Sequence, residues 1–138
     1  MSETEPSIIQ LQAEAQEAAR FSYSPYSRFR VGAALLGASG RIYRGTNVEN
    51  RSLGVTNCAE RTAFFTALTS GEKEFVAIAV FSPDSDVPLS PCGACRQVIS
   101  EFVSPEFPIY FSGKDGKFIR AEMRDMFPFD TLHDLANR

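Results

Sequence analysis

The sequence lacks an excess of basic charge and has no long hydrophobic run. It contains 14 Lys and Arg residues against 17 Asp and Glu residues, which gives a net charge of -3 at pH 7. This balance argues against a protein that binds the phosphate backbone of nucleic acids. No stretch approaches the roughly 20 apolar residues of a membrane span. The composition therefore favours a small, weakly charged ligand, with neither nucleic acid nor membrane as a partner.

Cysteine is also scarce, and the features of a secretory signal peptide are missing. The first 20 residues are acidic and amphipathic, without a basic start, a long apolar segment or a small-residue cleavage site. Three cysteines in a leaderless chain indicate a reducing, cytoplasmic location. In that compartment a C-x-x-C pair binds metal or is redox-active more often than it forms a structural disulfide.

The chain is long enough for one domain over residues 1–138, and no repeat or linker divides it. Hydrophobic periodicity predicts the element order α-β-β-α-β-α-β-β. This order favours an α/β three-layer sandwich, in which helices cover a mixed sheet of about five strands. The first predicted helix begins after Ser7 as its N-cap, and the second spans 58–71 with Asn57 as its N-cap. The third spans 92–103, and a short helix lies around 131–136. The predicted strands lie within 30–48 (two, joined by a turn at 37–40), 75–82, 108–112 and 118–123.

All three cysteines lie at two predicted helix N-termini, where the unpaired N–H groups and the helix dipole favour thiolate. Cys92 and Cys95 share a helix face, and Cys58 would approach from the other helix. Three sulfurs around one ion leave a fourth tetrahedral position open, which is typical of catalytic zinc. The sequence thus predicts one Zn²⁺ per subunit. The only histidine, His133, lies in a segment typical of a solvated helix face, so we do not expect it to close the site.

Glu60 follows Cys58 by two residues. Side chains in a first helical turn lean back toward the N-terminus, so both can reach the space before the helix. A carboxylate beside a metal-bound water can transfer its proton. The alternative is a favourable charge in a first turn. Next to three cysteines, we favour proton transfer.

Two arginines accompany the cysteines. Arg61 lies three residues after Cys58, and Arg96 lies four residues after Cys92, so each can share a helix face with a sulfur. A zinc with three thiolates carries a net charge of -1, and hydrogen-bond donors are needed to draw electron density from the sulfurs. We expect both arginines to tune the metal in this way. The alternative is that both are solvated.

The combination of C-A-E with P-C-x-x-C resembles the zinc-dependent nucleoside and nucleobase deaminases. The segments SPYSRFRVGAAL, GRIYRGTNVEN, CAERTA and SPCGACRQVI are similar to the small three-cysteine cytidine deaminases, over roughly Ser24 to Phe102. The resemblance implies the residue roles that follow: zinc ligands at Cys58, Cys92 and Cys95, the proton shuttle at Glu60, the ribose 3′-hydroxyl contacts at Asn47 and Glu49, the aromatic contact to the pyrimidine at Phe29, and main-chain contacts to the base at Ala59 and Cys92.

The resemblance further implies hydrolytic deamination of free cytidine and 2′-deoxycytidine to uridine and 2′-deoxyuridine plus ammonia, in pyrimidine salvage. A zinc-bound hydroxide would attack C4 while Glu60 moves the protons. Such proteins are typically homotetramers with active sites at subunit interfaces. They usually have a Leu-Pro pair followed after two residues by a Phe that reaches a neighbouring site. Here Phe129 directly follows Pro128, so the resemblance does not predict the role of the stretch 126–135.

Three alternatives remain open. A deaminase of a related aminopyrimidine nucleoside, such as blasticidin S, would keep the zinc chemistry, although Asn47 and Glu49 argue for a ribose. A dithiol redox protein would use Cys92 and Cys95 but leave Glu60 unexplained. A non-catalytic zinc-stabilised module would need a fourth ligand.

Overall fold

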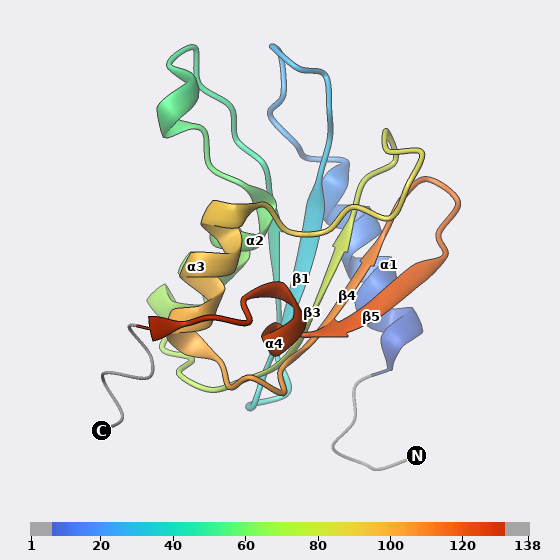
Figure 1. Ribbon diagram of the computed structural model, residues 1–138. Helices are drawn as coiled ribbons and strands as arrows, with labels where there is room; N and C mark the ends of the chain where they lie inside the picture. Colours follow the sequence, from blue (N-terminus) through green and yellow to red (C-terminus); the bar gives the residue numbers. More distant parts are fainter. Residues whose placement is uncertain (1–6, 132–138) are drawn as a thin grey trace.

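The computed structural model describes residues 7–131, which form a single mixed sheet between helices (Figure 1). The α/β sandwich expected from the periodicity is confirmed. The predicted short helix around residues 131–136 and His133 lie outside the described part, apart from Thr131. Among the described residues, no helix has the length and apolar content needed to cross a membrane.

Five strands pair in the order β2-β1-β3-β4-β5. The β3–β4 pair is parallel, and the other neighbouring pairs are antiparallel. A parallel pair needs a crossover connection, which here contains α3 (Gly93–Phe102). The strands are β1 (Gly32–Gly37), β2 (Ile42–Thr46), β3 (Phe75–Phe81), β4 (Pro108–Ser112) and β5 (Phe118–Glu122).

Helices cover both faces of this sheet (Figure 1). On one face, α1 (Ile8–Ala19) buries Leu11 and Ala15 against Ala34 and Ala79 of the central strands. Its N-cap Ser7 accepts a hydrogen bond from the backbone N–H of Gln10, as a capping residue does. The other face carries α2 (Ala59–Thr69) and α3. Two short elements complete the described chain: the 3-10 helix η1 (Leu53–Val55) and α4 (Met123–Met126).

The larger core lies on the α2 and α3 face. Phe64 of α2 and Ile99 of α3 are fully buried there, and the ring of Phe64 packs against those of Phe75 and Phe102. Leu35 and Ile78 complete this layer from the sheet. Burying such side chains contributes roughly 1.5–3 kcal/mol each. The two helices are therefore held firmly on one face, and their N-termini are fixed relative to each other.

Gly45 lets α2 lie directly on β2. A Cβ atom at this position would collide with the backbone of Ala59 and Ala63 in the first turns of the helix. Glycine is needed here because the two backbones approach closely. The start of α2, and every side chain on its first turn, is thus placed by contact with the sheet.

Candidate metal centre

Two helix N-termini meet at one end of the sheet, and each begins with a cysteine. Cys58 is the N-cap of α2, and Cys92 is the N-cap of α3. We expected Asn57 to cap α2, but its side-chain amide donates to the hydroxyl of Thr62 instead. The N-cap position of α2 thus has no side-chain hydrogen bond, which leaves the Cys58 sulfur available.

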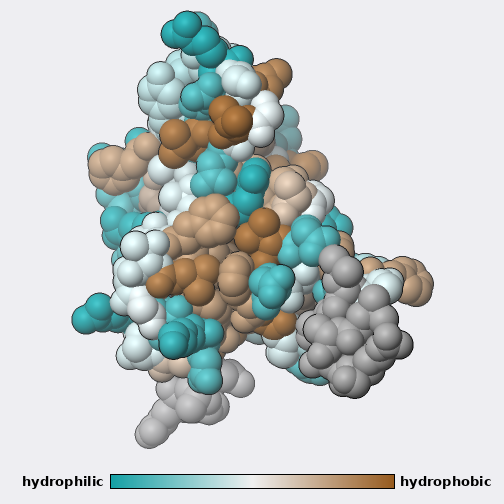
Figure 2. Space-filling model, turned by 90° about the vertical axis from the view of Figure 1, so that its left-hand side faces the viewer, coloured by the Kyte–Doolittle hydropathy of each residue, from teal (hydrophilic) through white to brown (hydrophobic). Residues whose placement is uncertain are grey.

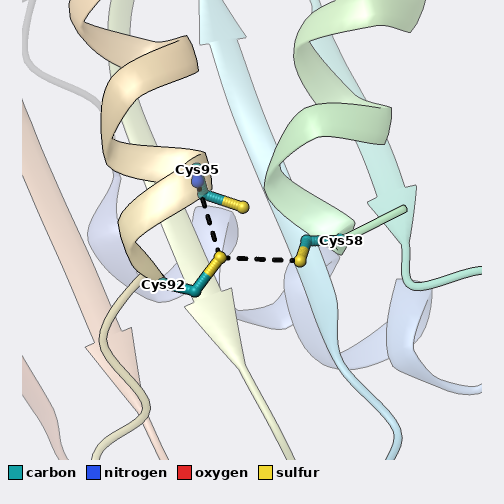
Figure 3. Close-up of side chains that lie close together, drawn as sticks. All are labelled: Cys58, Cys92 and Cys95. Carbon is teal, nitrogen blue, oxygen red and sulfur yellow. Dashed lines mark hydrogen bonds between the residues drawn. The ribbon is translucent and has the colours of Figure 1, made fainter. Parts of the chain in front are cut away.

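The three cysteine sulfurs face a common space between α2 and α3 (Figure 3). The Sγ atoms of Cys58 and Cys92 are 3.7 Å apart, and all three sulfurs lie within 4.8 Å of one another. Cys92 is exposed, Cys58 is partly buried and Cys95 is buried. None of the three forms a disulfide.

This geometry fits a zinc ion. Zn–S bonds of about 2.3 Å in a tetrahedral site separate the sulfurs by roughly 3.8 Å. The measured Cys58–Cys92 separation matches that value. Among the described residues, these three are the ones whose ligand atoms cluster closely enough to hold a metal. The three sulfurs can therefore hold one zinc ion.

Arg61 lies beside the sulfurs and favours the charged form of Cys58. Its Nη2 atom donates to the Sγ of Cys58 over 3.2 Å. The pKa of the Cys58 thiol falls to about 5, first through its hydrogen bond with Cys95 and then through the guanidinium of Arg61. Thiolate is the form that binds metal, so Cys58 is electrostatically prepared for a cation. The pKa of the Cys95 thiol is raised instead, by its hydrogen bond to Cys58 and by burial.

Glu60 is buried beside the same cluster, with 4% of its surface exposed. Burial, together with the nearby negative Cys58 sulfur, raises the pKa of its carboxyl to about 7. The carboxyl also hydrogen-bonds with the Cys95 thiol, which places it against the sulfurs. A buried acidic group at a metal centre can hold or release a proton there.

Arg96 has a different position from the one that the spacing suggested. Its guanidinium donates to the carbonyl oxygens of Pro91 and Met126 and to the hydroxyl of Ser90. In the described chain none of its hydrogen bonds goes to sulfur. Arg96 therefore ties the loop before Cys92 to the end of α4, and it reaches the metal site only through the backbone.

A second group of side chains lies next to Cys58. Val48 forms two isolated β-bridges, one with Asn57 and one with Tyr23 on its other side. These bridges place Asn47 and Glu49 between the loop that carries Phe29 and the start of α2. Phe29 is partly buried against the larger core.

Asn47 and Glu49 hold that loop by hydrogen bonds. The Asn47 side chain accepts from Ser22 and from the Val31 N–H, and it donates to the Phe29 carbonyl. Since an amide carries two N–H donors and one oxygen with two lone pairs, these bonds leave one amide N–H unused. These bonds could not be expected from the spacing of the residues alone.

Ser27 was not among the residues that the sequence indicated. Its hydroxyl donates to Glu49 and accepts from the backbone N–H of Phe29. A serine hydroxyl that bonds the N–H two residues on is a recognised turn pattern, and Ser27 precedes Phe29 by two. That pattern was the available signal.

The chain matches known proteins over most of its length. Residues 7–111 match the model of the cytidine and deoxycytidylate deaminase zinc-binding region. A cytidine deaminase of Sporosarcina psychrophila is 47% identical over 121 residues, which cover 88% of each chain. A cytidine deaminase of Halalkalibacterium halodurans is 46% identical over 115 residues, covering 83% of this chain and 86% of the relative.

Solved structures agree with these matches. The crystal structure of cytidine deaminase from Burkholderia pseudomallei superimposes with a TM-score of 0.85 at 42% identity, covering 89% of this chain and 98% of that one. Cytidine deaminase from Mycobacterium tuberculosis gives a TM-score of 0.79 at 36% identity, with coverage of 90% and 96%.

Proposed function

The chain belongs to the family of zinc-dependent cytidine and deoxycytidylate deaminases, and we propose that it converts free cytidine and 2′-deoxycytidine to uridine and 2′-deoxyuridine. Water adds at C4 of the base, and the amino group leaves as ammonia. The observation that carries the proposal is the meeting of three sulfurs and one buried carboxyl at two helix N-termini. Pyrimidine salvage is the matching physiological role.

Cys58, Cys92 and Cys95 are the zinc ligands in this proposal. When bound, zinc lowers the pKa of water and so supplies a nucleophile at neutral pH. The side chain of Arg61 draws electron density from the Cys58 sulfur through its hydrogen bond. Arg96 acts at a distance, because it holds the carbonyl of Pro91 immediately before Cys92.

Glu60 moves the protons. Its carboxylate takes a proton from the attacking water and gives it to ring N3. It then takes the proton of the new hydroxyl on C4 and gives it to the departing amine, so that the C4 carbonyl forms as ammonia leaves. Each transfer needs a group within hydrogen-bond reach of the reacting atoms. The first turn of α2 supplies such a group, because Glu60 is buried against the sulfurs.

The residues around Val48 bind the nucleoside. Phe29 packs against the flat pyrimidine. The free N–H of Asn47 donates to the sugar 3′-hydroxyl, and the carboxylate of Glu49 accepts from it. The main chain of Ala59 and Cys92, where helix N–H groups have no partner within the helix, contacts the base.

One preparation tests this function in two ways. Zinc is measured per chain, while loss of cytidine absorbance and release of ammonia are followed. We expect one zinc per chain and stoichiometric ammonia from both cytidine and 2′-deoxycytidine. If both are inert while another aminopyrimidine nucleoside reacts, the substrate assignment is wrong.

We further propose that one domain over residues 1–138 assembles into a homotetramer in the cytoplasm, with active sites at the subunit interfaces. Three free thiols fit a reducing compartment.

Hydrophobic side chains gather on the face seen in Figure 2. Exposed apolar residues include Leu53, Val55 and Phe65, and Phe129 is 90% exposed. Such patches are typical of interaction sites. Sedimentation at four times the 15.2 kDa of the chain would support the tetramer, whereas sedimentation as a monomer would exclude it.

A further inference from the structure

The hydroxyl of Ser27 joins two parts of the nucleoside-binding region. It donates to Oε2 of Glu49, and it accepts from the backbone N–H of Phe29 over 3.0 Å. Ser27 itself is exposed and lies in the turn that ends before the extended chain at Phe29. It does not pack in the core, so its contribution is the orientation of these two partners.

The carboxylate of Glu49 is held from one side. Its Oε1 atom accepts from the backbone N–H groups of Tyr26 and Ser27, over 3.0 and 3.1 Å. Its Oε2 atom accepts from the Ser27 hydroxyl. A carboxylate has about four lone-pair positions, so three are occupied and one on Oε2 remains. The Ser27 hydroxyl therefore decides in which direction that free position points.

The backbone of this turn is also constrained. Arg28 has a positive φ of 59°, a conformation that non-glycine residues rarely adopt. The Arg28 N–H donates to the Ser24 carbonyl, and the Glu49 carboxylate closes the same turn. The cost of this conformation is offset by the surrounding hydrogen bonds, in which Ser27 and Glu49 are the side-chain members.

We propose that Ser27 is a positioning residue for substrate binding: its hydroxyl fixes the Glu49 carboxylate so that the remaining lone pair receives the sugar hydroxyl. This inference rests on the proposed function, since it concerns the same nucleoside site. Loss of the Ser27 hydroxyl frees the Glu49 side chain, and ordering it again costs binding energy. Without that hydroxyl, the backbone N–H groups of Tyr26 and Ser27 still hold Oε1 of Glu49, but Oε2 has lost its hydrogen bond.

Kinetics with two substrates test this role. Cytidine has the 3′-hydroxyl that Glu49 receives, and 3′-deoxycytidine lacks it. For Ser27→Ala we expect kcat/KM for cytidine to fall about three- to tenfold, mainly through KM, because one side chain must be ordered on binding. For 3′-deoxycytidine, measured with excess enzyme, we expect a clearly smaller loss, because only the contact through the Phe29 backbone is then affected. Ser27→Thr, which keeps the hydroxyl, restores cytidine turnover.

The chain contains a matched control. Ser39 donates to Glu72 and accepts from the backbone N–H of Arg41 two residues on, in the turn between β1 and β2. The arrangement is the same as at Ser27, but this turn contributes no residue to the proposed metal or nucleoside site. Ser39→Ala should leave the selectivity between the two substrates unchanged. An equal loss with both substrates in Ser27→Ala, or no loss with either, would overturn the proposal.

A second measurement does not depend on cytidine turnover. The pKa of Glu49 lies below its usual value, mainly because of the Ser27 hydroxyl. Carboxyl-carbon NMR should therefore find a higher Glu49 pKa in Ser27→Ala than in the wild type. An unchanged pKa would contradict the contact itself. A wild type without activity on cytidine would refute the proposed function instead, while the NMR comparison would still judge the contact.

Discussion

At the scale of single residues, the space between α2 and α3 brings together the guanidinium of Arg61, the three cysteine thiols and the carboxyl of Glu60. Arg61 donates to Cys58, and Glu60 is buried beside Cys95. In the proposed mechanism, Arg61 supplies charge to the sulfurs and Glu60 transfers protons. The two contributions can be separated by substituting each residue alone.

Glu60→Gln should retain zinc and fold but lose turnover. An amide of the same size cannot accept and release the proton, and removal of a general acid–base group typically costs 10²–10⁴-fold, so we expect about that loss in kcat. Zinc content and kcat are measured on one sample. Glu101→Gln, an exposed change on α3, is the control with the same loss of charge. A fully active Glu60→Gln enzyme would remove Glu60 from the mechanism.

Arg61→Gln should keep zinc but slow the reaction. Hydrogen bonds to charged groups contribute roughly 1.5–3 kcal/mol, so we expect a decrease of roughly tenfold or more in kcat. The reason is that the Cys58 thiolate then donates its full electron density to the metal. Zinc content and the rate with cytidine check this. An unchanged rate would dismiss the charge argument.

At the scale of elements, the sequence predicted the sheet and the three long helices because their hydrophobic periodicity is strong. The four-residue α4 was missed, and residues 118–123 were expected to be one strand. The strand ends at Glu122, whose side chain forms a capping box with Asp125. So short a helix has no periodicity, and this local pairing was the available signal.

The contacts between residues distant in the chain could not be predicted from the sequence either. Arg96 bonds the carbonyl of Met126, 30 residues along the chain. Its spacing from Cys92 suggested a shared helix face, but a long side chain can turn toward any carbonyl within reach. The cysteine cluster was easier to predict, because chemistry limits where three thiols can serve one ion.

Gly45→Ala should disturb the metal centre through the placement of α2. The new Cβ would push the helix from β2, at a typical cost of about 1–3 kcal/mol for overpacking. Gly32→Ala is the matched control, because its Cβ would meet the backbone of Ala15 and Ala19 in α1. We expect both to lower the free energy of unfolding in denaturant. The absorption of cobalt(II) bound in place of zinc should change in Gly45→Ala alone; identical spectra in both would contradict this.

At the scale of the whole molecule, zinc should connect the two helices that cover one face of the sheet. Cys58 begins α2, and Cys92 and Cys95 lie at the start of α3. A ligand that binds only the folded state stabilises it by about 2.7 kcal/mol at a hundred times its Kd. Chelation should therefore lower Tm, and zinc but not magnesium should restore it. A Tm that is independent of zinc would contradict a bound ion that links the helices.

The coordination sphere of the metal tests the account most directly. X-ray absorption of the zinc-loaded protein should find three sulfur neighbours at about 2.3 Å and one lighter atom at about 2.0 Å. Cys92→Ala should lose the metal under the same loading conditions. A sphere closed by four protein side chains, or one with fewer than three sulfurs, would contradict an open zinc site held by Cys58, Cys92 and Cys95.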